Sequence, residues 1–117
     1  MCQLRQLADI WGDGTPWVQI PRLQQEALAA QIHLVKAGEE ALFGDPGGML
    51  GRLSGLRCPV LLIEGGASPP VIGAVHAGLA ARIPQAERVV VAGAAHMLPI
   101  THPTQVSGEV LRFLRGD

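Results

Sequence analysis

The chain has 117 residues and a formal net charge of −1, and its nine lysines and arginines are placed singly. A chain of this length forms one domain or a piece of one and buries roughly two-thirds of the surface it exposes when unfolded. Without a basic cluster or an apolar run of membrane-spanning length, we expect neither nucleic acid nor a membrane as partner.

The composition is apolar for a chain this small. Hydrophobic residues make up 48% and charged residues 16%, so we expect part of the surface to be covered by another chain or by more of the same protein. Cys2 and Cys58 form no Cys-x-x-Cys pair and do not suggest a disulfide framework. No charged segment with an apolar continuation opens the chain. A reducing, cytoplasmic location is the expectation.

Residues 1–55 are predicted to be a helical segment. Leu4, Leu7 and Trp11 have the spacing of one helical face, and the glycines at 12 and 14 end that helix. We expect Trp11 and Trp17 to pack locally around this turn. A second helix should begin at Pro21 and be weakened at Gly38. Its apolar stripe is Leu28, Ile32, Val35 and Leu42. A turn over 44–48 and a loose segment over 49–57 follow.

Residues 56–117 predict an α/β unit. Apolar runs bounded by glycine and proline indicate buried parallel strands near 59–64 and 88–92, joined by a crossover helix over 70–83. This βαβ unit should be right-handed. A last helix over 103–115 is expected to bury Val106, Val110, Phe113 and Leu114. Two parallel strands alone leave unpaired edges, so more strands are expected from elsewhere.

His96 is the candidate catalytic residue. The valines of the second strand end in Gly93-Ala94-Ala95, which places His96 at the carboxyl end of that strand. Open α/β sheets bind their ligands at this edge.

Five segments occur in order along the chain: Leu56 to Gly66, the helix end Ile83-Pro84, Arg88 to Val91, Gly93 to Met97, and His102-Pro103 with a closing helix. In this order they resemble the end of an α/β-hydrolase. Residues 11–17 and the helix after Pro21 are similar to the late cap or lid region of some members. The resemblance implies a partial α/β-hydrolase fold, with a cap-like segment over 1–55 and the C-terminal βαβα part over 56–117.

The same resemblance makes His96 the triad histidine of a serine esterase-like enzyme that hydrolyses a small acyl substrate. The chain departs from the family in three places. Ala95 replaces the usual glycine before the histidine, and Ala67-Ser68 occupy the place where an aspartate is common. A serine there could orient an imidazole but would not stabilise its positive charge. There is no Gly-x-Ser-x-Gly nucleophile elbow.

Ser68 itself is a poor nucleophile candidate. The residue after an elbow serine donates its N–H to the oxyanion, and Pro69 has none. We expect Ser68 to cap the crossover helix instead. His33 is expected on a helix surface, His76 on the crossover helix, and His102 as a solvated cap residue.

No metal or cofactor is predicted. Paired cysteines or carboxylates at ligand spacing are missing, and Gly65-Gly66-Ala67 lacks the third glycine and the later acidic residue of a dinucleotide site.

Two hypotheses follow. In the first, the chain is the C-terminal portion of a serine hydrolase whose N-terminal portion carries the nucleophile, so the chain alone should be inactive. In the second, it is a non-catalytic half-domain that joins sheet edges with a copy of itself as a homodimer. The two are compatible.

Overall fold

A computed structural model describes residues 2–116 as a mixed α/β chain with one two-stranded parallel sheet. Strand β1 spans Val60–Gly65 and β2 spans Ala86–Val91, and they pair in register from Val60 with Ala86 to Gly65 with Val91. Helix α4, Pro70–Arg82, connects them. The predicted βαβ unit is therefore confirmed, with boundaries within two residues of those expected. The burial expected for the second strand is wrong, because no residue of β2 is buried and Val90 is 53% exposed.

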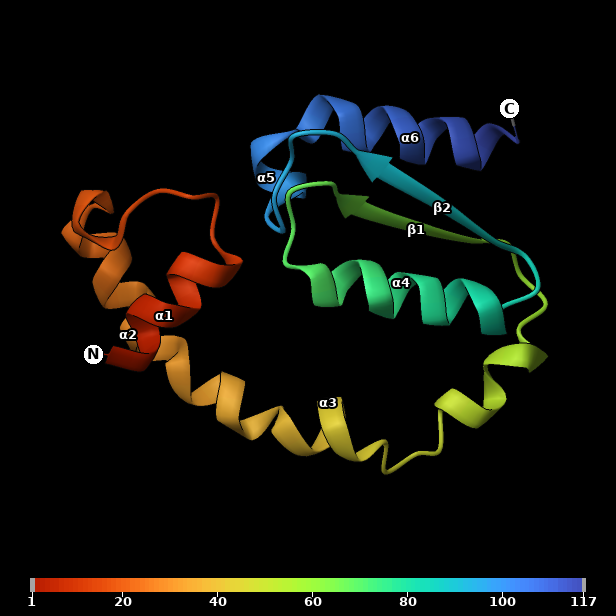
Figure 1. Ribbon diagram of the computed structural model, residues 1–117, viewed down its shortest axis with the longest axis horizontal. Helices are drawn as coiled ribbons and strands as arrows, with labels where there is room; N and C mark the ends of the chain where they lie inside the picture. The colour runs from red at the N-terminus through yellow and green to blue at the C-terminus, as the bar shows by residue number, and fades with distance from the viewer. Residues whose placement is uncertain (1, 117) are drawn as a thin grey trace.

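Helices cover both faces of the sheet (Figure 1). Helix α4 packs on one face and α6, Pro103–Arg115, on the other. The short helix α5, Leu98–Thr101, connects β2 to α6 at the carboxyl ends of the strands. Because each strand has a helix above and below, its apolar residues need not alternate with polar ones, as the sequence of β1 shows.

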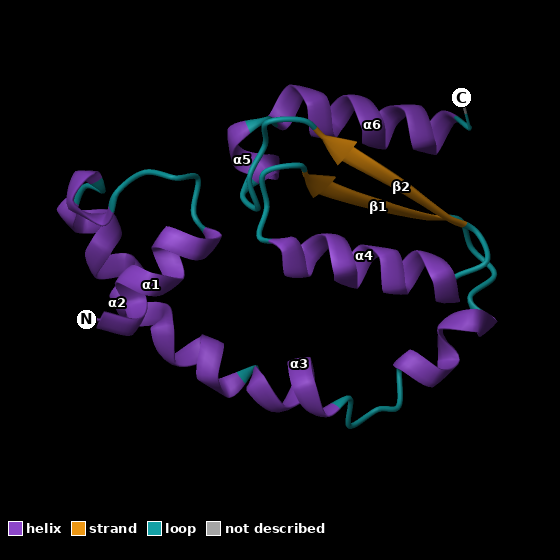
Figure 2. Ribbon diagram, viewed as in Figure 1, coloured by secondary structure: helices purple, strands orange, loops and turns teal. Residues whose placement is uncertain are grey.

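The N-terminal half is helical and lies beside the sheet rather than on it (Figures 1 and 2). Helix α1 spans Cys2–Trp11 and α2 spans Arg22–Ala37, with a 3-10 turn at Trp17–Gln19 between them. Helix α3, Glu39–Gly44, and a 3-10 segment at Leu50–Gly55 lead back to the start of β1. The α2–α3 arm thus runs along the molecule and returns the chain to the sheet.

Two details of this half differ from expectation. The second helix is two helices, because the backbone at Gly38 ends α2 and Leu42 belongs to α3. The segment expected to be loose contains the 3-10 turn at Leu50–Gly55. Glycine weakens a helix by its greater backbone freedom, and here that weakness produces a break.

The buried core is small. The buried apolar residues among those described are Leu4, Trp17, Ile83, Ala94 and Leu98. The predicted stripe of the arm is wrong in part, since Val35 and Leu42 are 48% and 74% exposed. The burial expected for α6 is also wrong, because no residue of this helix is buried. Val110 and Leu114 are 37% and 73% exposed, and Val106 and Phe113 are half-buried. Two strands and one helix on each face do not offer enough surface to cover every apolar stripe. Within residues 2–116, no helix has the length and apolarity needed to cross a membrane.

Candidate functional site

His96 lies in the turn between β2 and α5, at the carboxyl end of the sheet. Its imidazole meets the indole of Trp11 edge to face, with ring centroids 5.0 Å apart and an interplanar angle of 70°. Trp11 comes from the end of α1, so this contact joins the N-terminal helices to the sheet. The expectation that Trp11 packs only within its own turn is therefore wrong.

The loops that follow the two strands are tied together. The Gly66 N–H donates to Val91 O at 2.8 Å, and the Ala67 N–H donates to Ala94 O at 2.9 Å. A side chain at Gly65 would overlap the carbonyl groups of Ala94 and Ala95. This close approach requires glycine, and it fixes the loop carrying His96 against the loop carrying Ser68.

A cavity of about 430 Å³ opens beside this junction, and we call it the His96 cavity. Its polar side chains are those of Glu64, Ser68, His76 and His96. Its apolar wall comes from β1, α4 and the α5 region: Ile63, Ile72, Met97, Leu98, Pro99 and Ile100. One acidic, one hydroxyl and two imidazole side chains therefore share one apolar-walled space, a composition typical of ligand sites.

Ser68 does not cap α4 as expected. The N-cap residue is Pro69, and no side-chain hydrogen bond caps the helix. The Ser68 Oγ is buried and has no hydrogen-bond partner among the described residues. A buried hydroxyl without a partner has lost its hydrogen bonds to water, so the Ser68 Oγ is a polar group left unsatisfied beside the His96 cavity.

Glu64 is a buried carboxylate near the end of β1, with only 6% of the residue exposed. It accepts two hydrogen bonds from one edge of the Arg88 guanidinium: Arg88 Nε donates to Glu64 Oε2 at 3.1 Å, and Arg88 Nη2 donates to Glu64 Oε1 at 2.6 Å. His76 Nδ1 lies 2.8 Å from Glu64 Oε2. The hydrogen bonds from Arg88 hold the pKa of the Glu64 carboxyl below its usual value, despite the opposing effect of burial.

The sequence interpretation missed this cluster. Its signal is an acidic residue in an otherwise apolar strand, with an arginine on the next predicted strand and a histidine on the helix between them. A charged side chain on a strand that is covered on both faces requires a partner that pairs with its charge or forms hydrogen bonds with it. Arg88 and His76 are the partners of Glu64, but they lie far from it in the sequence, so no local pattern indicates the contact.

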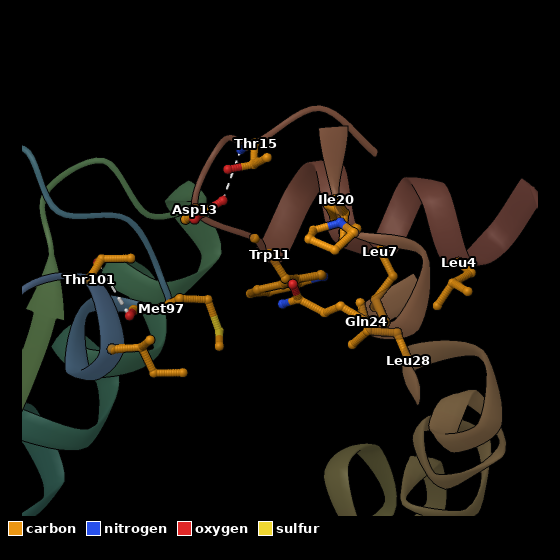
Figure 3. A pocket seen from close by; sticks show the side chains of 14 residues that line it. Leu4, Leu7, Trp11, Asp13, Thr15, Ile20, Gln24, Leu28, Met97 and Thr101 are labelled. Carbon is orange, nitrogen blue, oxygen red and sulfur yellow. Dashed lines mark hydrogen bonds between the residues drawn. The ribbon is translucent and has the colours of Figure 1, made fainter. Parts of the chain in front are cut away.

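A second cavity, of about 450 Å³, lies between α1, α2 and α5, and we call it the α1–α5 cavity (Figure 3). Trp11 stands in the middle of the view, with Leu7 and Leu28 on its one side and Met97 on its other. Polar groups in the lining include Asp13, which accepts the Thr15 N–H at 2.9 Å, and also Gln24 and Thr101. Its apolar residues are Leu4, Leu7, Ala8, Trp11, Ile20, Pro21, Leu28, Met97 and Ile100.

Met97 and Ile100 line both cavities. Because Trp11 belongs to one cavity and its contact partner His96 to the other, the two spaces adjoin at this ring pair. A ligand at this junction can place an apolar group beside Trp11 and a polar group beside His96.

The other two histidines lie outside both cavities. His33 is exposed on α2. His102 precedes α6 without a capping side-chain hydrogen bond, and its Nδ1 lies 2.8 Å from the Thr101 Oγ1. In the part of the chain that the structure describes, no three His, Cys, Asp or Glu side chains are grouped for a metal ion.

Comparisons with protein-family models, with curated proteins and with solved structures find no match for this chain.

Proposed function

We propose that the chain is the C-terminal part of a serine hydrolase of the α/β-hydrolase type, with His96 as its general base. The supporting observation is the position of His96: it follows the second of two parallel strands, at their carboxyl ends, where the His96 cavity and the α1–α5 cavity adjoin. The resemblance of residues 56–117 to the end of such a fold supports the same assignment.

In this proposal, His96 accepts the proton of a serine hydroxyl as the serine attacks an acyl carbonyl. The imidazolium then gives that proton to the leaving group, and the cycle repeats with water as nucleophile. The serine comes from a preceding portion of the protein, because Pro69 cannot supply the oxyanion N–H that Ser68 would need.

Glu64 and Ser68 are the two side chains of the His96 cavity that carry acceptor oxygens, as a triad acid does, and their roles differ. Both Glu64 oxygens are engaged by Arg88 and His76, so Glu64 is not free to orient His96. The Ser68 Oγ is unpartnered in the His96 cavity and can accept a hydrogen bond from the imidazole. Such a hydrogen bond orients the ring without adding a charge, so a carboxylate from the preceding portion would complete the triad.

The substrate in this proposal is an ester or similar acyl compound with one apolar part. The α1–α5 cavity is walled by leucine, isoleucine, methionine and tryptophan side chains, which bury a hydrocarbon group favourably. Its junction with the His96 cavity at Trp11 puts the scissile bond next to the imidazole.

The test begins with native mass spectrometry of the protein from its own cells. We expect a bound polypeptide of different sequence. It should contain Gly-x-Ser-x-Gly and react with a fluorophosphonate probe. His96→Ala should then reduce ester turnover by about 10³-fold or more, as for loss of a general base acting with its nucleophile. The control is His33→Ala, on the exposed surface of α2. Unchanged turnover in His96→Ala contradicts the role of His96.

A homodimer of half-domains is the second candidate, and the two-stranded sheet favours it. Within residues 2–116, each strand pairs only with the other, so each has a free edge. Two copies that join these edges form a four-stranded sheet. Analytical ultracentrifugation should show a mass of twice the single chain, and Leu62→Glu should prevent folding or association. A monomeric wild-type protein contradicts this candidate.

A further inference from the structure

We propose that His76 is an acyl-accepting side chain: its Nε2 attacks activated acyl compounds that enter the His96 cavity, while the Glu64 carboxylate lies beside its Nδ1. This reaction needs no serine, so it is independent of the hydrolase proposed above.

The ring of His76 is largely buried, with 17% of its side chain exposed, and it lines the His96 cavity from α4. Nδ1 is buried and lies 2.8 Å from the Oε2 of Glu64, within ion-pair distance but outside hydrogen-bond geometry. Nε2 is then the nitrogen that remains for a ligand in the cavity. A carboxylate beside Nδ1 favours the tautomer with the proton on Nδ1, which leaves the nucleophilic lone pair on Nε2.

Arg88 keeps the Glu64 carboxylate in place and ionised. It bonds to both Glu64 oxygens and also donates from Nη2 to the carbonyl of Gly73 at 3.3 Å, on the same helix as His76. Arg88, Glu64 and His76 therefore connect β2, β1 and α4 through a chain of polar contacts. An imidazole fixed by such contacts has less freedom to lose than an exposed one when it reacts.

The acyl transfer involves only the ester, the His76 ring and water. The Nε2 lone pair forms a bond to the carbonyl carbon, the bond from that carbon to the leaving oxygen breaks, and a phenolate leaves. The ring, which keeps its Nδ1 proton, becomes an acylimidazolium cation. The Glu64 carboxylate stabilises this positive charge at short range. Water then attacks the acyl carbon and the bond from that carbon to Nε2 breaks, which gives a carboxylic acid, releases one proton to solvent and restores the neutral imidazole.

The cavity limits which acyl compounds react. Ile63, Ile72 and Leu98 form the apolar wall around His76, and Ser68 adds an unpartnered hydroxyl. Small uncharged acyl groups on a good leaving group fit this surface, whereas a charged acyl group would lose its hydration there.

The test uses the whole chain with 4-nitrophenyl acetate, in a Cys2→Ser, Cys58→Ser background because the exposed thiol of Cys58 also reacts with esters. Release of 4-nitrophenolate should be about tenfold slower with His76→Gln, within the range of a positioned imidazole. His33→Gln, which removes an exposed histidine outside the cavities, should leave the rate unchanged. Circular dichroism establishes that each variant is folded.

A second measurement needs no substitution at the site. Limiting diethylpyrocarbonate followed by peptide mapping should label His76 before His33, although His33 is far more exposed. Glu64→Gln should remove this preference while His76 is still present. An equal rate for His76→Gln and the background protein, or labelling of His33 first, overturns the proposal.

Discussion

At the scale of single residues, the site depends on the close approach of Gly65 to the loop that carries His96, where there is no room for a side chain. The Cβ of an alanine at Gly65 would overlap the backbone carbonyls of Ala94 and Ala95, so the two loops would have to separate. Such a shift would also break the hydrogen bond from the Ala67 N–H to Ala94 O.

We therefore expect Gly65→Ala to lower the free energy of unfolding by about 2 kcal/mol, as an overpacked site does. Urea denaturation followed by circular dichroism measures the change. Gly51→Ala is the matched control, because nothing lies within 4 Å of its added Cβ, and its effect should stay within about 0.5 kcal/mol. Equal effects of the two substitutions contradict the close approach at Gly65.

The Glu64–Arg88 pair gives the fold a dependence on acid. The pKa of Glu64 is lowered in the folded protein from the ordinary value of 4.5, chiefly by the hydrogen bonds from Arg88. Its contribution to stability is therefore complete above the unfolded-state pKa and is lost as the pH falls through the folded-state pKa. Glu64→Gln should cost about 2 kcal/mol at pH 7, the usual range for hydrogen bonds to a charged group.

Urea midpoints measured from pH 7 to pH 3 provide the comparison. The difference between the wild type and Glu64→Gln should shrink as the pH falls below 4.5. A difference that stays constant over this interval contradicts the ionised pair.

Sequence reasoning found the position of His96 at this scale but not its surroundings. The strand-then-glycine pattern places a residue along the chain, and it placed His96 after β2. The contacts of Glu64 with His76 and Arg88 join residues on three elements, and no local pattern specifies them. Ser68 was expected to cap a helix from its local context, but Pro69 takes the N-cap position.

At the scale of elements, apolar runs and helix breakers predicted the βαβ unit and the last helix well. Helix α6 has the predicted bounds, Pro103–Arg115, because proline favours its first turn and a glycine follows it. The burial of the α2–α3 arm was not predicted correctly. Its apolar stripe suggested that another element covers it, but the sheet does not. Periodicity shows which face is apolar, but not whether another element covers it.

The two glycines of α6 should respond in opposite ways to alanine. Gly108 lies within the helix with open space around its added Cβ, so Gly108→Ala should raise the free energy of unfolding by about 0.5 to 1 kcal/mol. Gly116 ends the helix at a φ of 76°, so Gly116→Ala should lower it by about 1 kcal/mol. Urea denaturation measures both. A gain in stability for Gly116→Ala would contradict this helix end.

At the scale of the whole molecule, the exposed arm separates two groups of helices. Phe43 is 84% exposed in α3, and Leu42 beside it is 74% exposed. Exposed segments with few packing contacts open easily, and proteases cut there first.

Chymotrypsin should therefore make its first cut after Phe43, and mass spectrometry of the early products identifies the site. Phe43→Ala should slow that cut without changing the fold, since the side chain is exposed. If the products of residues 1–43 and 44–117 elute together from a sizing column, side-chain contacts such as that of Trp11 with His96 hold them. A first cut between Val60 and Val91 contradicts the predicted weakness of the arm.

Because Trp11 contacts His96 edge to face, the fluorescence of its indole reports on the junction of the two cavities. Trp11 is half-buried and lines the α1–α5 cavity, whereas Trp17 is buried with 8% exposed. In a Trp17→Phe background, the indole fluorescence of the chain comes from Trp11 alone. Its intensity and wavelength then report whether a molecule has displaced water beside His96, before any reaction takes place.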